Sequence, residues 1–304
     1  MKAEEAKIVF MGNAEFAIPA LEKINKTFGI CLVVTNPDKP AGRGLKPTPT
    51  PIKLKAMELK LPVLQVEKLK DLTFCEQIKG ISPDIIVVIA FKILPPEVFT
   101  IAKIASFNVH PSLLPKYRGP APINWQIING EKTTGLTTFV LKEQVDAGNI
   151  ILQWEYPIPE GSTAGDLHDL LAPLAGDIAV ETCKVLLKGD YTLREQDEEY
   201  ATKAPKLFPH MCRINWEQNC IALRNFIHGV SPNPGAWTIL DGKRFKIYRC
   251  RYEIKQHSAP LGKAIFESGK MLFPCLDGYI IPLEIQIEGK KVMKIDDFLR
   301  GYRP

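Results

Sequence analysis

The first 110 residues alternate short apolar runs with stretches of helical length, and this alternation constrains the fold more than any other feature. The runs of strand length are Lys7–Met11, Ile30–Thr35, Pro62–Gln65, Ile85–Ala90 and Ser106–Val109. The stretches with helical spacing between them are Ala14–Lys26, Pro51–Leu61 and Asp71–Lys79. Thr50 precedes Pro51, a pair typical of a helix start. Strands and helices in alternation predict an α/β fold, a Rossmann-like, mostly parallel sheet with helices on both faces.

The pattern changes twice further along the chain. Thr134–Leu141 and Asn149–Tyr156 are extended apolar runs joined by a polar turn, which predicts a hairpin appended to the sheet, and Thr163–Leu187 is helical. From about Phe208, short β-like runs follow a short helix around Glu217–Val230, with turn signals about ten residues apart, which favours a small sandwich or barrel. We therefore expect a first domain over 1–189, a polar linker over 190–207 and a second domain over 208–304.

Composition excludes several classes of protein. With 45% hydrophobic and 24% charged residues the chain is globular, and no apolar run approaches the about 20 residues of a membrane helix. The N-terminal segment Met1–Lys7 carries acidic residues and lacks the apolar core of a signal peptide, so we expect a cytoplasmic protein, and a monomer. The seven cysteines include no C-x-x-C pair, and Cys212, Cys220, His210 and His228 have no common zinc spacing. We expect no disulfide framework and no metal.

Positive charge is concentrated in the last third of the chain. Residues 208–304 hold 15 Lys and Arg against 9 Asp and Glu, a net charge of +6, whereas residues 1–207 hold 24 against 25. Such asymmetry is typical of a protein with a polyanionic partner, either nucleic acid or a membrane surface. The alternative is a surface on which lysines simply maintain solubility.

Three polar residues form the candidate catalytic site. Asn108 and His110 lie at the end of an expected strand, where alternation places both side chains on one face, and Asp146 lies on the hairpin turn. Acyl transfer to an amine needs a donor for the oxyanion, a base for the ammonium proton and a group that orients the base. Asn108, His110 and Asp146 supply one each. Taken singly, each is also an ordinary turn residue; their joint arrangement favours catalysis.

Two segments then resemble a known family. Phe107–Pro122 (FNVHPSLLPKYRGPAP) and Gly135–Ile151 (GLTTFVLKEQVDAGNII) are similar to the active-site and folate-site segments of folate-dependent formyltransferases. Nearly the whole chain resembles the methionyl-tRNA formyltransferases among them. The resemblance implies transfer of the formyl group of 10-formyltetrahydrofolate to methionine on charged initiator tRNA, with Asn108, His110 and Asp146 as catalytic residues.

The same resemblance implies a folate site. Its residues are Phe91, Ile93, Leu94, Ser112, Leu113, Leu114, Pro115 and Val145. A flat pterin requires an apolar slot of this kind, with backbone groups that bind its edge. The alternative is ordinary core packing.

Basic residues in two places match family segments that bind tRNA. Asn36–Lys46 resembles the loop that enters the acceptor end, where Lys39, Arg43 and Lys46 offer phosphate contacts and Arg43 matches an arginine that wedges at the first base pair. The alternative is a solvated, proline-rich loop. In the C-terminal part, which resembles an OB-like β-barrel, Lys243, Arg244 and Lys246 alternate with apolar residues as a phosphate-binding face would.

Two departures from the family and three rival functions remain. The sequence stops soon after Arg300–Pro304, so we expect any tRNA contact that a longer tail makes to be missing. Asn13, in Phe10–Phe16, stands where Thr or Ser is more usual, and this segment is no G-x-G-x-x-G fingerprint, so we expect no dinucleotide. One rival function is that of a UDP-amino-sugar N-formyltransferase, which would share the catalytic residues without needing the basic loop Asn36–Lys46. Another is that of a formyltetrahydrofolate hydrolase, which would use water as the nucleophile. A catalytically silent tRNA-binding module would have no reason to keep three buried polar residues.

Overall fold

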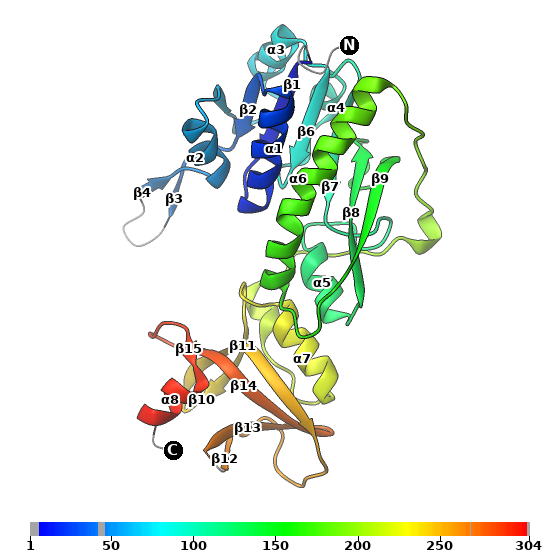
Figure 1. The fold of residues 1–304 in the computed structure, drawn as a ribbon. Coiled ribbons are helices and arrows are strands. Elements are labelled where there is room, and N and C mark those ends of the chain that lie inside the picture. Colours follow the sequence, from blue (N-terminus) through cyan, green and yellow to red (C-terminus); the bar gives the residue numbers. More distant parts are fainter. Residues whose placement is uncertain (1–5, 42–45, 268, 303–304) are drawn as a thin grey trace. The chain divides into compact units, whose positions relative to one another are not determined.

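The computed structural model describes residues 6–41, 46–267 and 269–302 (Figure 1). The chain forms two compact units. The N-terminal unit takes in the described parts of 1–118 together with 135–156 and 168–203, and the C-terminal unit takes in 119–134, 157–167 and the described parts of 204–304. The boundaries expected at residues 189 and 208 stay a prediction. The C-terminal unit additionally contains two short segments, 119–134 and 157–167, of the stretch expected to form the first domain.

A seven-stranded sheet in the order β5-β2-β1-β6-β7-β8-β9 forms the centre of the N-terminal unit. Its strands are β1 (Ile8–Gly12), β2 (Leu32–Thr35), β5 (Val63–Gln65), β6 (Ile85–Ile89), β7 (Ala105–His110), β8 (Thr133–Val140) and β9 (Ile150–Pro157). The first five run parallel, and β8 is antiparallel to β7. The expected mostly parallel α/β sheet with an appended hairpin is therefore confirmed.

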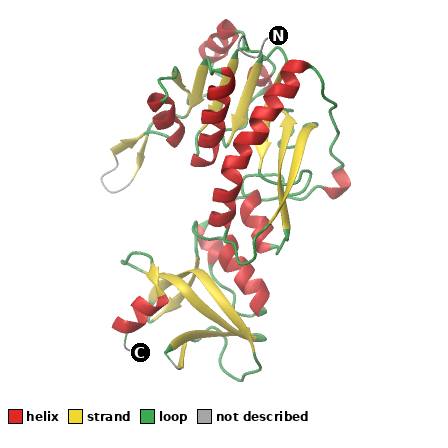
Figure 2. Cartoon of the chain, in the orientation of Figure 1, coloured by secondary structure: helices red, strands yellow, loops and turns green. Residues whose placement is uncertain are grey.

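Helices cover both faces of this sheet, as Figure 2 shows by colour. They are α1 (Ile18–Phe28), α2 (Pro51–Glu58), α3 (Leu72–Ile81), α4 (Pro96–Phe99) and the long α6 (Ala164–Lys188), with 3₁₀ turns at Glu15–Ala17 and Glu198–Tyr200. Every residue of β1 and β6 is buried, as parallel strands covered on both sides require. The Thr50 side chain caps α2 by accepting a hydrogen bond from the Lys53 amide, so the helix start predicted there is confirmed.

An antiparallel sheet of six strands forms the centre of the C-terminal unit. It contains β10 (Ala236–Leu240), β11 (Lys243–Ile254), β14 (Gly278–Ile287), β13 (Lys270–Cys275) and β12 (Ile265–Glu267), and β15 (Met293–Lys294) pairs with β14. The helices of this unit are α5 (Pro122–Ile128), α7 (Cys220–Gly229) and α8 (Ile295–Gly301), with a 3₁₀ turn at Pro209–Cys212. The core includes Phe245, Phe273, Leu223 and Ile227. A separate β domain was predicted from the change of pattern near Phe208, and the structure confirms it.

The loop expected to bind tRNA begins and ends in a short hairpin, β3 (Lys39–Ala41) paired with β4 (Lys46–Thr48). Asp38 anchors its base, because both of its carboxylate oxygens lie 2.8 Å from Lys53 Nζ and one accepts a hydrogen bond from Gln65 Nε2. The same amide donates to the carbonyl of Asn36. The start of the loop is thus fixed to α2 and β5.

The interval 190–207, expected to be a linker, contains residues that are bonded to the sheet. Arg194 exchanges two backbone hydrogen bonds with Ile150 at the start of β9, of 2.7 and 3.0 Å. Arg118 pairs with Lys203 in a parallel bridge. Between residues 192 and 200, Gln196 is half-buried whereas its neighbours in the interval are exposed.

Candidate active site

The three expected catalytic residues belong to the N-terminal unit, and two of them lie on one strand. Asn108 and His110 are alternate residues at the carboxyl end of β7, next to β6 on one side and to β8 on the other. Carboxyl ends of strands form the ligand-binding edge of sheets of this type. Asp146 lies on the loop between β8 and β9, where its backbone adopts a left-handed φ of 53°.

His110 and Asp146 are brought together. The distance from His110 Nδ1 to Asp146 Oδ2 is 3.9 Å, and the two side chains are only 6% and 12% exposed. This separation is longer than a hydrogen bond and short enough for a strong charge interaction. The predicted convergence of the acid and the imidazole is therefore present.

The tautomer of His110 is fixed by a group that sequence reasoning missed. His110 Nε2 lies 2.8 Å from the backbone carbonyl of Tyr117. A carbonyl only accepts hydrogen bonds, so Nε2 must carry the proton and, in the neutral ring, the lone pair is on Nδ1, the nitrogen nearer Asp146. The Tyr117 carbonyl thus selects the tautomer of His110.

The carboxamide oxygen of Asn108 is buried without a hydrogen-bond partner. In the described part of the chain, Asn108 Oδ1 and Asn36 Oδ1 are the two buried side-chain oxygen or nitrogen atoms without a hydrogen-bond partner. Such groups are rare because an unsatisfied buried acceptor is costly, and each calls for an explanation. A ligand that completes the hydrogen bonding of Asn108 is one such explanation.

The expected folate residues divide into exposed and buried ones. Ile93 is 71% exposed and Val145 is 45% exposed, whereas Leu94 and Leu114 are buried in the apolar clusters beside the sheet. Ile93 and Leu94 also line an apolar hollow of about 250 Å³, together with Leu69, Lys70, Pro95, Pro96 and Glu143. Exposed apolar side chains beside a hollow are typical of a ligand-binding surface.

The remaining expected folate residues support the local backbone. Ser112 is fully buried, and its hydroxyl donates to the Lys116 carbonyl at 2.7 Å. Leu113, Pro115 and Phe91 are half-buried. Leu113 lies against Gly135, where any side chain would overlap it, so the glycine permits this close approach.

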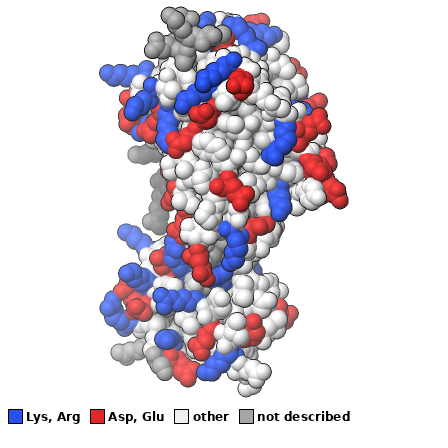
Figure 3. Space-filling view, turned by 45° about the vertical axis from the view of Figure 1, so that its right-hand side comes forward, with Lys and Arg blue, Asp and Glu red and all other residues white. Residues whose placement is uncertain are grey.

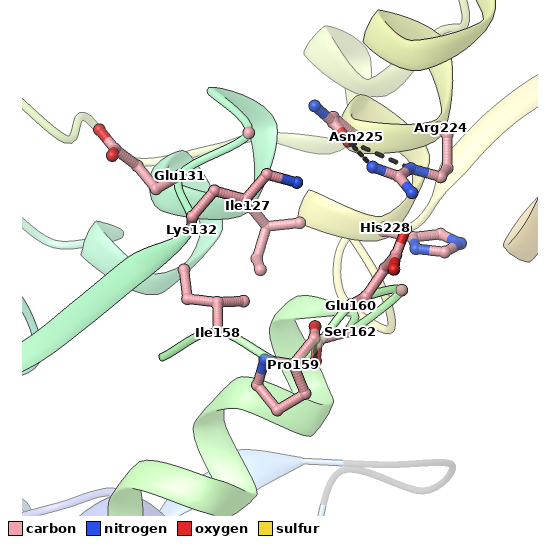
Figure 4. A pocket seen from close by; sticks show the side chains of 12 residues that line it. Ile127, Glu131, Lys132, Ile158, Pro159, Glu160, Ser162, Arg224, Asn225 and His228 are labelled. Carbon is pink, nitrogen blue, oxygen red and sulfur yellow. Dashed lines mark hydrogen bonds between the residues drawn. The ribbon is translucent and has the colours of Figure 1, made fainter. Parts of the chain in front are cut away.

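A second hollow, of about 40 Å³, lies within the C-terminal unit (Figure 4). It is lined by both basic and acidic side chains, including Lys132, Arg224, Glu131 and Glu160. About one water molecule fills such a volume. This hollow is too small for a folate.

The expected tRNA-binding residues lie in different units. Lys39 is exposed in the β3–β4 hairpin, Lys46 begins β4, and Arg43 lies outside the described residues. Lys243, Arg244 and Lys246 are on β11, where the Arg244 guanidinium lies 4.6 Å from the ring centre of Trp237. Figure 3 shows Lys and Arg side chains along the left-hand side of its lower part, with Asp and Glu among them.

Among the cysteines and histidines considered for a metal, Cys220 lies in a group of potential ligands in the described part of the chain. Cys220 lies beside Cys275, with sulfurs 3.3 Å apart, and Asp277 completes the group of potential ligands in the described chain. Burial raises the pKa of both thiols, which keeps them protonated and disfavours metal binding. Asp277 Oδ1 accepts a hydrogen bond from the Cys220 amide at the start of α7.

The described helices include none that is long and apolar enough to cross a membrane.

Comparisons with known proteins decide the family. Residues 6–183 match the model of the formyl transferases, and residues 206–303 match the model of the formyl transferase C-terminal domain. The methionyl-tRNA formyltransferase of Chlorobium limicola is 42% identical over 98% of this chain and 96% of its own. That of Bacteroides thetaiotaomicron is 38% identical over 100% and 98%. The chain belongs to the methionyl-tRNA formyltransferase family. It is accordingly a formyl-transferring enzyme, as the resemblance implied.

Two solved structures share the fold of this chain. An N-formyltransferase of Helicobacter canadensis, in complex with folinic acid and dTDP-3-aminofucose, superposes with a TM-score of 0.69 at 20% identity, over 91% of this chain and 98% of its own. HypX from Aquifex aeolicus, in complex with tetrahydrofolic acid, has a TM-score of 0.64 at 19% identity, over 97% and 46%. At this level of identity the likeness concerns the fold.

Proposed function

We propose that this enzyme transfers the formyl group of 10-formyltetrahydrofolate to the α-amino group of methionyl-initiator tRNA. The observation that carries the proposal is the state of His110, whose Nε2 is bonded to the Tyr117 carbonyl while Nδ1 lies 3.9 Å from Asp146. A neutral imidazole held in one tautomer beside a carboxylate is a suitable general base. Asn108, two residues earlier on the same strand, supplies a carboxamide donor.

The reaction follows from these groups. The α-amine attacks the formyl carbon, the carbonyl π bond breaks, and the oxygen becomes an oxyanion that receives a hydrogen bond from Asn108 Nδ2. His110 Nδ1 takes a proton from the new ammonium group. The oxyanion then re-forms the carbonyl as the bond from carbon to N10 of the folate breaks, and the imidazolium returns this proton to N10, so that the ring is again neutral. The products are the formylated amine and tetrahydrofolate.

Asp146 stabilises the imidazolium that exists between these two proton transfers. Two opposite unit charges about 4 Å apart attract each other by about 4 kcal/mol at an effective dielectric constant of about 20, and the cost of burying the charges offsets part of this attraction. The carboxylate and the ring are 3.9 Å apart and largely buried, so solvent screens them little. Replacing Asp146 removes this stabilisation and leaves the Nε2–carbonyl bond in place.

For the folate, we propose the apolar hollow beside Ile93 and Leu94, with Val145 on the loop that carries Asp146. The volume of about 250 Å³ lies near the lower end of the roughly 300–1,000 Å³ of small-molecule sites, which suits one ring system of a folate. The exposure of Ile93 and Val145 supports this assignment, because large apolar side chains gain from being covered by a ligand.

For the tRNA, we propose two basic surfaces. One is the β3–β4 hairpin with Lys39, Lys46 and the expected Arg43. The other is β11 with Lys243, Arg244 and Lys246, which supplies phosphate contacts without base recognition. The anchoring of Asp38 to Lys53 supports the first assignment, because it gives the hairpin a fixed base.

The test offers the purified protein 10-formyltetrahydrofolate with one acceptor at a time. The acceptors are methionyl-initiator tRNA, a UDP-amino sugar and water alone. We expect radiolabelled formyl groups on the tRNA, and His110→Ala should abolish the transfer. Label on the sugar, or release of formate without an acceptor, would replace the proposal by one of its rivals.

A further inference from the structure

Asp146 lies on a loop that places its carboxylate beside His110. The loop connects β8 to β9 and closes with a hydrogen bond from the Val140 amide to the Asn149 carbonyl. Asp146 itself has a left-handed backbone, a conformation that costs energy for a residue other than glycine and persists where neighbours enforce it. Contacts from outside the loop can help to enforce such a conformation.

Gln196 makes such contacts. Its Nε2 lies 2.8 Å from the carbonyl of Asp146 and 2.8 Å from the carbonyl of Gly148. The two amide protons of Gln196 thus bind two backbone oxygens on either side of Ala147. Fifty residues of sequence separate Gln196 from Asp146.

Arg118 fixes the orientation of this amide. Gln196 Oε1 accepts hydrogen bonds from Arg118 Nε at 3.0 Å and Nη2 at 2.8 Å. A guanidinium only donates, so the oxygen of Gln196 must face Arg118 and its nitrogen must face the loop. Arg118 in turn forms a bidentate pair with Glu198, at 2.9 and 2.7 Å, and holds the pKa of this carboxyl below its usual range.

The same stretch of chain also holds the other partner of His110. Thr202 Oγ1 accepts a hydrogen bond from the Tyr117 amide at 2.8 Å, and the Thr202 carbonyl accepts one from the Arg118 amide at 2.8 Å. The Tyr117 carbonyl is the group that bonds His110 Nε2. Residues 194–202, which we call the brace, thus bind on one side to the loop of Asp146 and on the other to the backbone that holds His110.

We propose that Gln196 is a positioning residue for formyl transfer, which sets the distance between the Asp146 carboxylate and His110 Nδ1. This inference rests on the proposed function, because it assigns Gln196 an effect through Asp146. Gln196 touches neither substrate nor the reacting atoms in this scheme. Its effect is therefore on kcat, with little change in the KM for either substrate.

The first test is Gln196→Ala, measured by single-turnover formylation at saturating substrates and by thermal unfolding. We expect kcat to fall by about tenfold to about 100-fold, since misplacement of a catalytic group by about 1 Å has effects of this size. Gln144→Ala is the matched control, because it removes an exposed glutamine from the loop of Asp146. The control should keep the wild-type kcat.

Gln196→Glu separates positioning from folding. Glutamate has the same length and keeps an oxygen for Arg118, but it turns a second oxygen toward two carbonyls in place of the donor. We expect the melting temperature to stay close to that of the wild type while kcat falls at least as far as in Gln196→Ala. A wild-type kcat in Gln196→Glu would overturn the proposal.

A double-mutant cycle identifies the residue through which Gln196 acts. On the background of Asp146→Asn, whose activity is already low, Gln196→Ala should cost less than about threefold, because the effects of residues that act as one unit do not add. Independent, multiplicative losses would refute the inference and leave the proposed function standing. If Asp146→Asn alone kept full activity, the catalytic assignment itself would fail.

Discussion

Replacing Asn108 by alanine has opposite expected effects on catalysis and on stability. Asn108 Oδ1 is buried without a hydrogen-bond partner, a state that costs about 1–3 kcal/mol. Truncation removes this cost, and the small cavity it leaves costs about 1 kcal/mol. The free energy of unfolding should therefore stay the same or rise slightly, and the melting temperature should not fall.

Activity should respond very differently. Loss of one oxyanion donor lowers kcat by about 100-fold to about 1,000-fold, equivalent to about 2.7–4 kcal/mol of transition-state stabilisation. The assay is single-turnover formylation of methionyl-initiator tRNA, run beside calorimetry of the same preparation. Asn149→Ala is the control, because it removes a carboxamide that accepts a bond from Lys142 at the surface.

Two results would contradict the argument about Asn108. A kcat within about threefold of the wild type would show that the carboxamide does not stabilise the transition state. A fall of the melting temperature by more than about 10 °C would show that Asn108 is satisfied in the folded protein, because only then does its removal cost a hydrogen bond.

Three further expectations concern charge. Asp146→Asn should lower kcat by about 100-fold or more while tRNA affinity stays unchanged in filter binding, and an equal loss of both would refute its catalytic role. Alanine at Lys243, Arg244 and Lys246 should reduce the slope of log affinity against log salt by about 0.9 for each phosphate that the protein no longer neutralises. An unchanged slope would show that the tRNA binds another surface of the protein. His228 is buried and near cationic side chains, which lowers its pKa from 6.5 to about 4, so the unfolded chain takes up a proton first as the pH falls. The C-terminal unit should lose about 3 kcal/mol of stability between pH 6.5 and 4, as denaturant titrations at several pH values can measure, and His228→Gln should abolish that loss.

The sequence predicts the helices and strands that have strong hydrophobic periodicity. It does not predict those whose bounds depend on contacts with other parts of the chain. Ile85–Ala90 was expected as a strand, and β6 spans Ile85–Ile89. The expected helix Ala14–Lys26 begins later, as α1 at Ile18, after a 3₁₀ turn. The sequence does not predict the helix α5 (Pro122–Ile128), because it is short.

At the site, the sequence predicted side chains and could not predict their backbone partners. Asn108, His110 and Asp146 carry recognisable chemistry, and a carboxylate was expected beside the imidazole. Any residue can supply a carbonyl, so nothing in the sequence singled out Tyr117. Gln196 lies in a polar stretch of weak periodicity, and its role depends on how that stretch returns to the sheet.

The brace also bears on how this protein can be dissected. A fragment that ends at residue 189 would retain Asn108, His110 and Asp146 but lack Gln196 and Thr202. Its β9 edge would also be without the pairing that Arg194 gives to Ile150, and an open strand edge promotes aggregation. An excised catalytic domain should therefore extend at least through Lys203 if it is to be both soluble and active.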